Sequence, residues 1–184
     1  VVGLWGLLDL VGNNSALPWL SLPIVILSAG VAGYTAFLFG QCEGRDLWQT
    51  PLLLPTLLAQ AVVAGGSTYL LLDLFIDVPE LKALRITTLA ALGALTFLIA
   101  TEIVSKGSRT VELATLEMTK GAYAQRFWLG GVLAGLIAPI VLIALALNGT
   151  APQGLGAIAA ICALVGLFSY EDAFVRAGQS VPLS

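Results

Sequence analysis

Five long apolar runs make up most of this chain. A helix needs about 20 apolar residues to cross the hydrocarbon core of a membrane. The runs lack the alternation that is typical of membrane β-strands, so helices remain as the form that satisfies the backbone in lipid. The sequence therefore predicts an all-α fold, an integral membrane helical bundle of about five transmembrane helices at Pro18–Phe39, Leu52–Phe75, Leu81–Val104, Phe127–Leu147 and Gln153–Tyr170.

The composition excludes a water-soluble domain. Of the 184 residues, 58% are hydrophobic and 10% are charged, whereas soluble domains carry about 25% charged residues. A fold of this size cannot bury so much apolar surface in its own core. The net charge of −3 gives no indication of nucleic-acid binding.

The chain divides into three parts. We interpret residues 18–175 as the transmembrane bundle and residues 176–184 as a cytoplasmic tail. Residues 1–17 begin with an apolar stretch that is too short to span a membrane, so we expect an interfacial segment or the end of a preceding helix. No basic stretch precedes these apolar residues, and a signal peptide is therefore not indicated.

The basic residues predict the orientation of the bundle. If the spans alternate, six of the eight basic residues lie on one side of the membrane, and positive charge favours the cytoplasm. We therefore expect residues 40–51, the 105–126 loop and the C-terminal tail to be cytoplasmic in a multi-pass protein of the bacterial cytoplasmic (inner) membrane. The six residues are Arg45, Lys106, Arg109, Lys120, Arg126 and Arg176.

Two spans carry stripes of polar side chains. The first contains Ser21, Ser28 and Thr35 at intervals of seven residues, and the second contains Thr56, Gln60 and Ser67 on one helix face. In lipid such groups need partners on neighbouring helices or in a cavity. We therefore expect further transmembrane helices, from outside this sequence, to pack against these two spans.

The fourth span contains features that affect helix packing. Gly131 and Gly135 form a GxxxG pair, which lets two helix backbones approach closely. Pro139 follows within the same span and removes one backbone donor, so we expect a kink there.

The sequence offers no ligand set for a bound redox centre. It contains no histidine and two isolated cysteines, Cys42 and Cys162, whereas haem and iron–sulfur clusters need histidine or several cysteines. We therefore expect neither haem nor an iron–sulfur cluster in this protein. A redox partner would then be a molecule that dissolves in the bilayer.

The stretch between the first two spans carries a recognisable set of residues. It reads Tyr34-Thr35-Ala36, then Gly44-Arg45, Leu47-Trp48, Thr50-Pro51 and Pro55. These pieces, with the later stretches RFWLGGVLAGLIAPIVL and RAGQSVPLS, resemble the NrfD/PsrC family of polysulfide reductase membrane subunits. Members of that family have about eight spans and a glycine where Ala36 stands, so this sequence resembles the C-terminal five spans.

The resemblance implies a function and a set of partners. It implies a membrane subunit of a respiratory oxidoreductase that exchanges electrons and protons between a quinone, menaquinone or ubiquinone, and a docked iron–sulfur cluster subunit. In this family that partner commonly serves a molybdopterin subunit or a multihaem cytochrome c subunit. Part of the family's quinone pocket comes from earlier spans.

Ionisable side chains inside the bilayer are costly and are therefore candidates for function. Asp73 lies near the outer end of the second span, and Glu102 lies near the inner end of the third, one turn before Lys106. We predict Asp73 and Glu102 as catalytic residues and Tyr34 and Gln60 as quinone-binding residues. Tyr34 lies nearer the inside than Asp73, so we do not expect these two to serve the same quinone.

Other interpretations of these residues stay open. Asp73 can extend its carboxylate to the outer surface, and Glu102 with Lys106 can form an interfacial salt bridge. Arg45 can pair with Glu43, Asp46 or a lipid phosphate. The protein as a whole can instead be a proton-translocating or small-solute-translocating unit without redox chemistry, or a non-catalytic membrane anchor.

Overall fold

The structure is a computed structural model that describes residues 17–105, 107–148 and 154–182. These residues form helices, connected by short segments, and the described ranges contain no strand. In chain order the elements are α2 (Leu17–Gly40), η1 (Asp46–Gln49), α3 (Leu53–Leu72), α4 (Leu81–Val104), α5 (Arg109–Thr119), η2 (Arg126–Ile137), α6 (Ala138–Leu147) and α7 (Leu155–Ser180). The predicted all-α fold is confirmed.

Five stretches are long and apolar enough to cross a membrane, as the sequence predicted. Four of them are α2, α3, α4 and α7, and the fourth in chain order runs through η2 and α6 without a break. The last span is longer than expected, because α7 continues to Ser180 instead of ending near Tyr170. The first part of the predicted tail, residues 176–180, is therefore helical. The predicted segment 1–17 lies outside the described residues except for Leu17.

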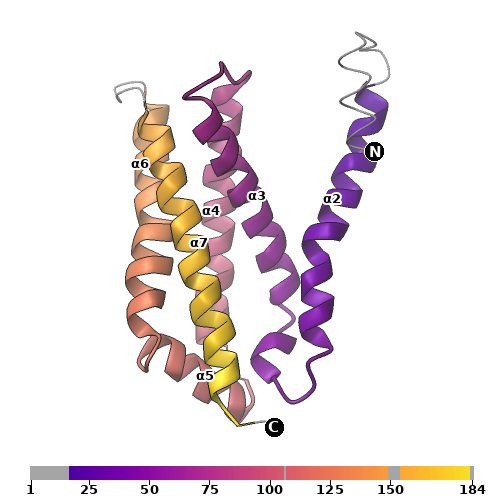
Figure 1. The fold of residues 1–184 in the computed structure, drawn as a ribbon, viewed down its shortest axis with the longest axis vertical. Helices are drawn as coiled ribbons and strands as arrows, with labels where there is room; N and C mark the ends of the chain where they lie inside the picture. Colours follow the sequence, from indigo (N-terminus) through magenta and orange to yellow (C-terminus); the bar gives the residue numbers. More distant parts are fainter. Residues whose placement is uncertain (1–16, 106, 149–153, 183–184) are drawn as a thin grey trace.

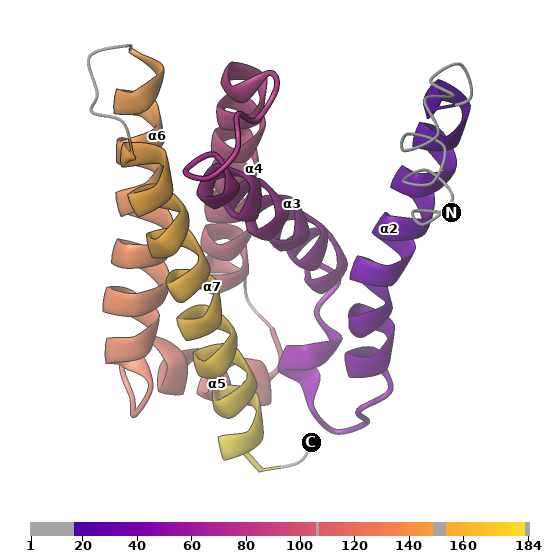
Figure 2. The same ribbon diagram turned by 45° about the horizontal axis from the view of Figure 1, so that its top comes forward.

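Helices α3, α4, α6 and α7 pack side by side, whereas α2 leans away from them (Figures 1 and 2). The pairs α3 with α4 and α3 with α7 are in extensive contact, and α2 contacts α3. Glycines allow the close approaches: Gly66 of α3 lies against Thr88 of α4, and Gly33 of α2 lies against Leu54 of α3. The core is centred on α7, whose alanines at 159, 160, 163, 173 and 177 are fully buried.

The span formed by η2 and α6 changes its winding partway across. Residues Arg126–Ile137 form a π-helix, in which the N–H of Ala138 still donates to the carbonyl five residues earlier. Such turns are rare and usually short. The α-helical part begins at Ala138, just before Pro139. We expected a kink at Pro139 because proline has no N–H to donate to the preceding turn.

Glycines join this span to α7. A Cβ atom built on Gly166 would lie 1.8 Å from the Cα atom of Gly135, so only glycine fits there. Gly131 likewise lies against Tyr170 of α7. The predicted role of the GxxxG pair in close helix packing is confirmed, with α7 as the partner helix.

The segment predicted as the 105–126 loop contains an unexpected helix, α5. Ser108 caps it by accepting a hydrogen bond from the N–H of Val111 at 3.4 Å, and Ala114 and Met118, one turn apart, are buried. α5 lies at one end of the bundle (Figure 1). The signals were present in the sequence: a serine cap followed by apolar residues at helical spacing.

The two polar stripes differ in burial. Thr56, Gln60 and Ser67 are buried, and contacts from α4 and α7 cover this side of α3. Our expectation that the α3 stripe needs helices from outside this sequence was therefore wrong. The α2 stripe, Ser21, Ser28 and Thr35, is exposed.

Candidate functional site

The hairpin between α2 and α3 folds back onto the end of the bundle. Its short helix η1 buries Leu47 and Trp48, and the Trp48 ring packs edge-on against Phe39 with ring centroids 5.1 Å apart. Trp48 also lies against α7, where a Cβ atom on Gly178 would be 2.3 Å from the indole nitrogen. The glycine at 178 is therefore required for this contact.

Two charged residues of the hairpin tie other elements together. Arg45 donates from Nη1 to the carbonyls of Gly178, Gln179 and Val181, at 2.8, 3.0 and 2.8 Å. These carbonyls at the end of α7 have no helical partner of their own. The carboxylate of Asp46 accepts hydrogen bonds from the hydroxyls of Ser108 and Thr110 at the start of α5. The sequence pointed to salt bridges or lipid for Arg45, but its partners are backbone carbonyls.

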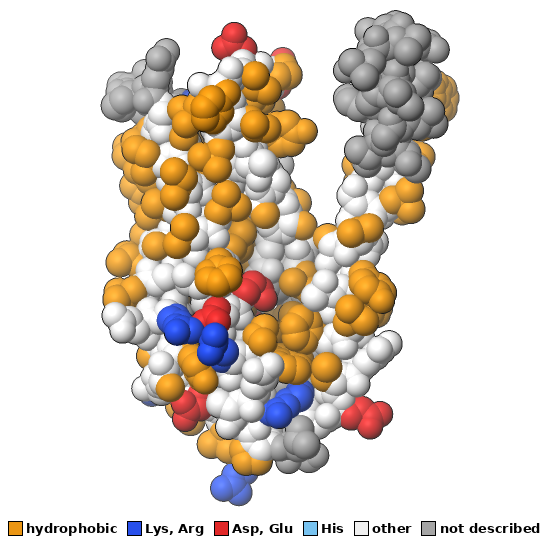
Figure 3. Space-filling model, viewed as in Figure 1, with side chains coloured by type: hydrophobic (Ala, Val, Ile, Leu, Met, Phe, Trp, Pro, Cys, Tyr) orange, Lys and Arg blue, Asp and Glu red, His pale blue; other side chains and the backbone are white. Residues whose placement is uncertain are grey.

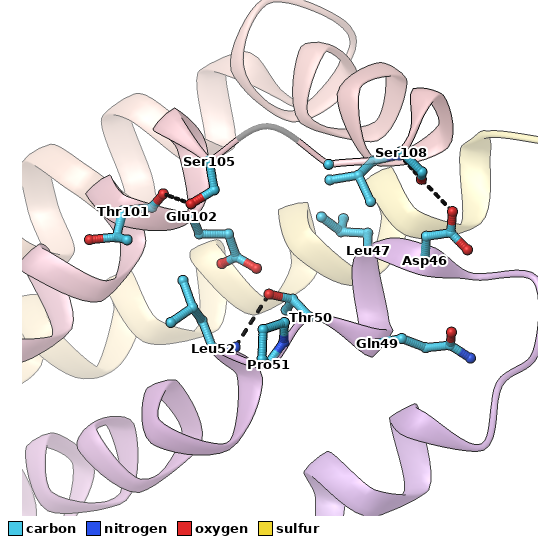
Figure 4. A pocket seen from close by; sticks show the side chains of 12 residues that line it. Asp46, Leu47, Gln49, Thr50, Pro51, Leu52, Thr101, Glu102, Ser105 and Ser108 are labelled. Atoms are coloured by element: carbon cyan, nitrogen blue, oxygen red, sulfur yellow. Dashed lines mark hydrogen bonds between the residues drawn. The ribbon is translucent and has the colours of Figure 1, made fainter.

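A cavity of about 540 Å³ lies beneath the hairpin, between the start of α3, the end of α4 and the start of α5. Figure 4 shows the labelled residues around it, with the Glu102 carboxylate pointing into the space beside Leu52 and Thr50. Most of the other lining side chains are apolar or carry hydroxyls. The lining residues are Asp46, Leu47, Gln49, Thr50, Pro51, Leu52, Thr101, Glu102, Ser105, Gly107, Ser108 and Val111.

Glu102 is the acidic residue of α4 that meets the core. Its side chain is 8% exposed, and Oε2 accepts a hydrogen bond from the hydroxyl of Tyr170 at 3.3 Å. The other oxygen, Oε1, is buried and has no hydrogen-bond partner among the described residues. Lys106, with which we expected Glu102 to pair, lies outside the described residues.

A second carboxylate follows directly on α7. Glu171 accepts a hydrogen bond from the side-chain amide of Gln60 at 2.6 Å, and it is the residue next to Tyr170, the partner of Glu102. Gln60, Glu102, Tyr170 and Glu171 therefore form one polar cluster that joins α3, α4 and α7. We refer to these four residues as the core polar cluster.

The structure brings together two of the four predicted site residues. Gln60 and Glu102 both belong to the core polar cluster, whereas Tyr34 is 60% exposed on α2 and Asp73 is half-buried at the C-terminal end of α3. The roles of all four remain predictions. Tyr170 and Glu171 were missed because we ended the last span at Tyr170; the acidic pair that follows it, in SYEDAF, was the available signal.

The cluster can donate and accept protons but offers no metal-binding set. In the described part of the protein, no three His, Cys, Asp or Glu side chains gather in a way that could hold a metal ion. A carboxylate with an unpaired oxygen at a cavity wall is suited to proton transfer, because the cavity admits a donor or acceptor and the tyrosine orients the group. Ionisable groups within membrane spans typically serve proton or ion pathways.

Comparisons with known proteins identify the family of this chain. The family described as "Polysulphide reductase, NrfD" matches residues 3–182. The C subunit of the polysulfide reductase of Wolinella succinogenes is 29% identical over 170 residues, which cover 88% of this sequence and 54% of that protein. The protein described here thus spans about half the length of this relative. No solved structure matches.

The match extends over nearly the whole sequence and includes every described span. It agrees with the resemblance found in the hairpin and in the last two spans. A multi-pass membrane protein follows from the five spans and from the family together. The chain belongs to the NrfD family of polysulfide reductase membrane proteins.

Proposed function

We propose that this protein is part of the membrane subunit of a respiratory oxidoreductase complex, and that it takes part in exchanging electrons and protons between a membrane quinone and a docked iron–sulfur protein. Family membership supports this proposal, as does the similarity to a protein named as one part of polysulfide reductase. The letter in that name implies other subunits in that complex. The electrons would then come from, or go to, a cofactor on another subunit.

The core polar cluster is the observation that carries the proposal. Reduction of a quinone to a quinol takes up two electrons and two protons, so protons must reach a site that lies in a medium without water. Glu102 is buried at the wall of a cavity of about 540 Å³ and contacts Tyr170. In the proposed role Glu102 holds a proton at the wall of the cavity and releases it into the cavity, while the hydroxyl of Tyr170 orients its carboxyl group.

Gln60 and Glu171 have a supporting role in the same proposal. The amide of Gln60 holds the Glu171 carboxylate at 2.6 Å, and Glu171 follows directly on Tyr170 in α7. The cavity is within the usual size range of small-molecule sites, about 300–1,000 Å³. Its apolar wall at Leu47, Leu52 and Val111 would suit a ring as well as water.

We also propose that additional transmembrane helices complete the quinone site. In the most apolar stretch of α2 only 6% of the residues are buried, and α2 diverges from the other helices (Figure 2). The relative is nearly twice as long as its matched part, so it contains enough further sequence to cover such a surface. Tyr34, on the exposed side of α2, would then face those helices.

The experiment is quinol-dependent electron transfer in the intact complex with Glu102→Gln. Glutamine keeps the size and hydrogen bonding of the side chain but cannot carry a proton. We expect turnover to fall at least about tenfold, because general acid–base groups contribute about 10²–10⁴-fold. The matched control is Glu112→Gln, at an exposed position on α5, which should leave turnover unchanged.

Two readouts keep this test decisive. Retention of the iron–sulfur subunit on the purified complex shows that the variant is assembled. Normal turnover in an assembled Glu102→Gln complex would contradict the proposed role of Glu102. Proton or solute uptake by the membrane subunit without any redox partner would instead support a translocating unit and contradict the redox proposal.

A further inference from the structure

Three charged side chains from two helices meet on the surface of the bundle. Arg126 begins η2, and Asp172 and Arg176 lie one turn apart on α7. Arg126 donates from Nη1 to one carboxylate oxygen of Asp172, and Arg176 donates from Nε to the other at 2.6 Å. Two positive charges share one negative charge, so the group carries a net positive charge. We refer to these three residues as the arginine pair and its aspartate.

Both arginines have N–H donors that Asp172 does not use. Their side chains are 53% and 54% exposed, whereas that of Asp172 is 20% exposed. A guanidinium has five N–H donors, and each arginine uses one of them toward Asp172. The three charged residues, with Phe168 and Ser169, line a groove of about 320 Å³. Figure 3 shows basic and acidic side chains interrupting a mostly hydrophobic face of the molecule.

The groove lies at the ends of two candidate membrane spans, where we expect the membrane to meet water. Arg126 is the first residue of its span, and Arg176 lies in the last part of the span that ends at Ser180. Trp128, two residues along, is 46% exposed and donates from its indole nitrogen to the carbonyl of Thr119 at 2.9 Å. Tryptophans in this setting are typical of the membrane interface.

An apolar track continues from the groove toward the middle of the bundle. Phe168 is 74% exposed, and Val165 and Ile161 follow it on the same exposed side of α7. At helical spacing these residues share a face with Asp172 and Arg176. The surface thus offers a basic head at the interface and an apolar strip along the span.

We propose that this surface is a binding site for an anionic phospholipid. The guanidinium groups of Arg126 and Arg176 hold the phosphate, because charge-assisted hydrogen bonds from arginine to phosphate are short and strong. The acyl tail lies along Phe168, Val165 and Ile161. Asp172 lies between the two guanidinium groups and offsets part of their charge. The apolar strip favours a lipid over a soluble anion or an acidic protein segment.

The test compares two lipids with the same acyl tails, phosphatidylglycerol and phosphatidylcholine, titrated onto the purified detergent-solubilised protein and counted by native mass spectrometry. We expect tighter binding of phosphatidylglycerol. Arg126→Gln with Arg176→Gln should weaken it about 25-fold and remove the preference, since each basic residue near an anionic headgroup contributes about a fivefold change. Matched controls are Lys82→Gln and Arg109→Gln, at exposed basic positions elsewhere.

A second variant distinguishes a lipid site from a structural ion pair. Asp172→Asn leaves both arginines but removes the negative charge, so phosphatidylglycerol binding should tighten about fivefold. This variant decides the matter if the double arginine variant fails to fold. Unchanged or weaker binding in Asp172→Asn would overturn the proposal.

Three other outcomes would also overturn it. Equal binding of the two lipids to the unaltered protein would remove the basis for a headgroup site. Displacement of phosphatidylglycerol by millimolar inorganic phosphate would indicate a site for a free anion. Loss of an associated subunit from the double variant, with the lipid preference intact, would indicate a protein-docking surface.

Discussion

Helices α2 and α7 are similarly apolar, yet α2 is the least buried of the five spans and α7 is the most buried. In its most apolar stretch α2 has 6% of its residues buried, whereas α7 has 39%. Both contain glycines, but Gly30 of α2 has no atom near it and Gly166 of α7 touches the backbone of Gly135. Apolar character therefore determines that a helix enters the membrane, and the placement of small residues determines which helices it packs against.

The same contrast holds for polar side chains. On the α3 stripe Gln60 bonds to Glu171, whereas the buried hydroxyls of Thr56 and Ser67 have no hydrogen-bond partner among the described residues. The stripe on α2 faces outward. Ser21 bonds to the carbonyl of Pro18 at 2.6 Å within its own helix. A polar residue inside a span therefore need not signal an external partner, since a local carbonyl or another helix of the same protein can satisfy it.

The largest expected effect comes from adding one methyl group at the α7 contact. In Gly166→Ala the new Cβ atom would overlap the Gly135 backbone, so the two helices must separate. We expect the free energy of unfolding to fall by about 3 kcal/mol, at the upper end of the usual cost of overpacking. The measurement is thermal or denaturant-induced unfolding in detergent.

The matched control for this change is Gly30→Ala in α2. No atom lies within 4 Å of a Cβ atom at that position, and alanine is the better helix former. We expect unchanged or slightly increased stability. Equal losses at positions 30 and 166 would show that α2 is packed as tightly as α7, against the difference described above.

A smaller effect is expected from Arg45→Ala, which frees the end of α7 from the hairpin. Three carbonyls lose a charged donor, and hydrogen bonds to charged groups contribute about 1.5–3 kcal/mol. We expect a loss of about 2 kcal/mol and faster proteolysis of residues 40–52. Arg109→Ala, at an exposed position on α5, is the control; an equal response in both variants would mean that the hairpin is not held through Arg45.

The smallest effect separates the two polar stripes. Gln60→Leu removes the donor to the Glu171 carboxylate, and we expect a loss of about 1–2 kcal/mol because a buried polar group is left unpaired. Ser28→Ala in α2 should change stability by less than about 0.5 kcal/mol, as is usual for exposed positions. A larger loss at Ser28 than at Gln60 in the isolated protein would reverse the comparison.

The sequence by itself determined the class of the protein, the approximate spans and the family. Hydropathy and length are local properties, and a bilayer imposes the same length on every span. The hairpin motif around Arg45 and Trp48 and the small pair Gly131 and Gly135 were visible for the same reason, since each depends on a few neighbouring residues. Helix α5 carried local signals as well, in Ser108 and the spacing of Ala114 and Met118.

Only the tertiary structure decided which polar groups meet. Gln60 and Glu171 are 111 positions apart in the sequence, and Glu102 and Tyr170 are 68 positions apart; no local pattern relates them. The structure also separated Tyr34 and Asp73 from Gln60 and Glu102, although all four are polar residues within apolar runs of the sequence. The physical reason is that packing between helices determines which face of each helix is buried. The close contact of Gly135 with Gly166 sets the rotation of α7 against its neighbour. That rotation turns Tyr170 toward the core and Asp172 toward the surface.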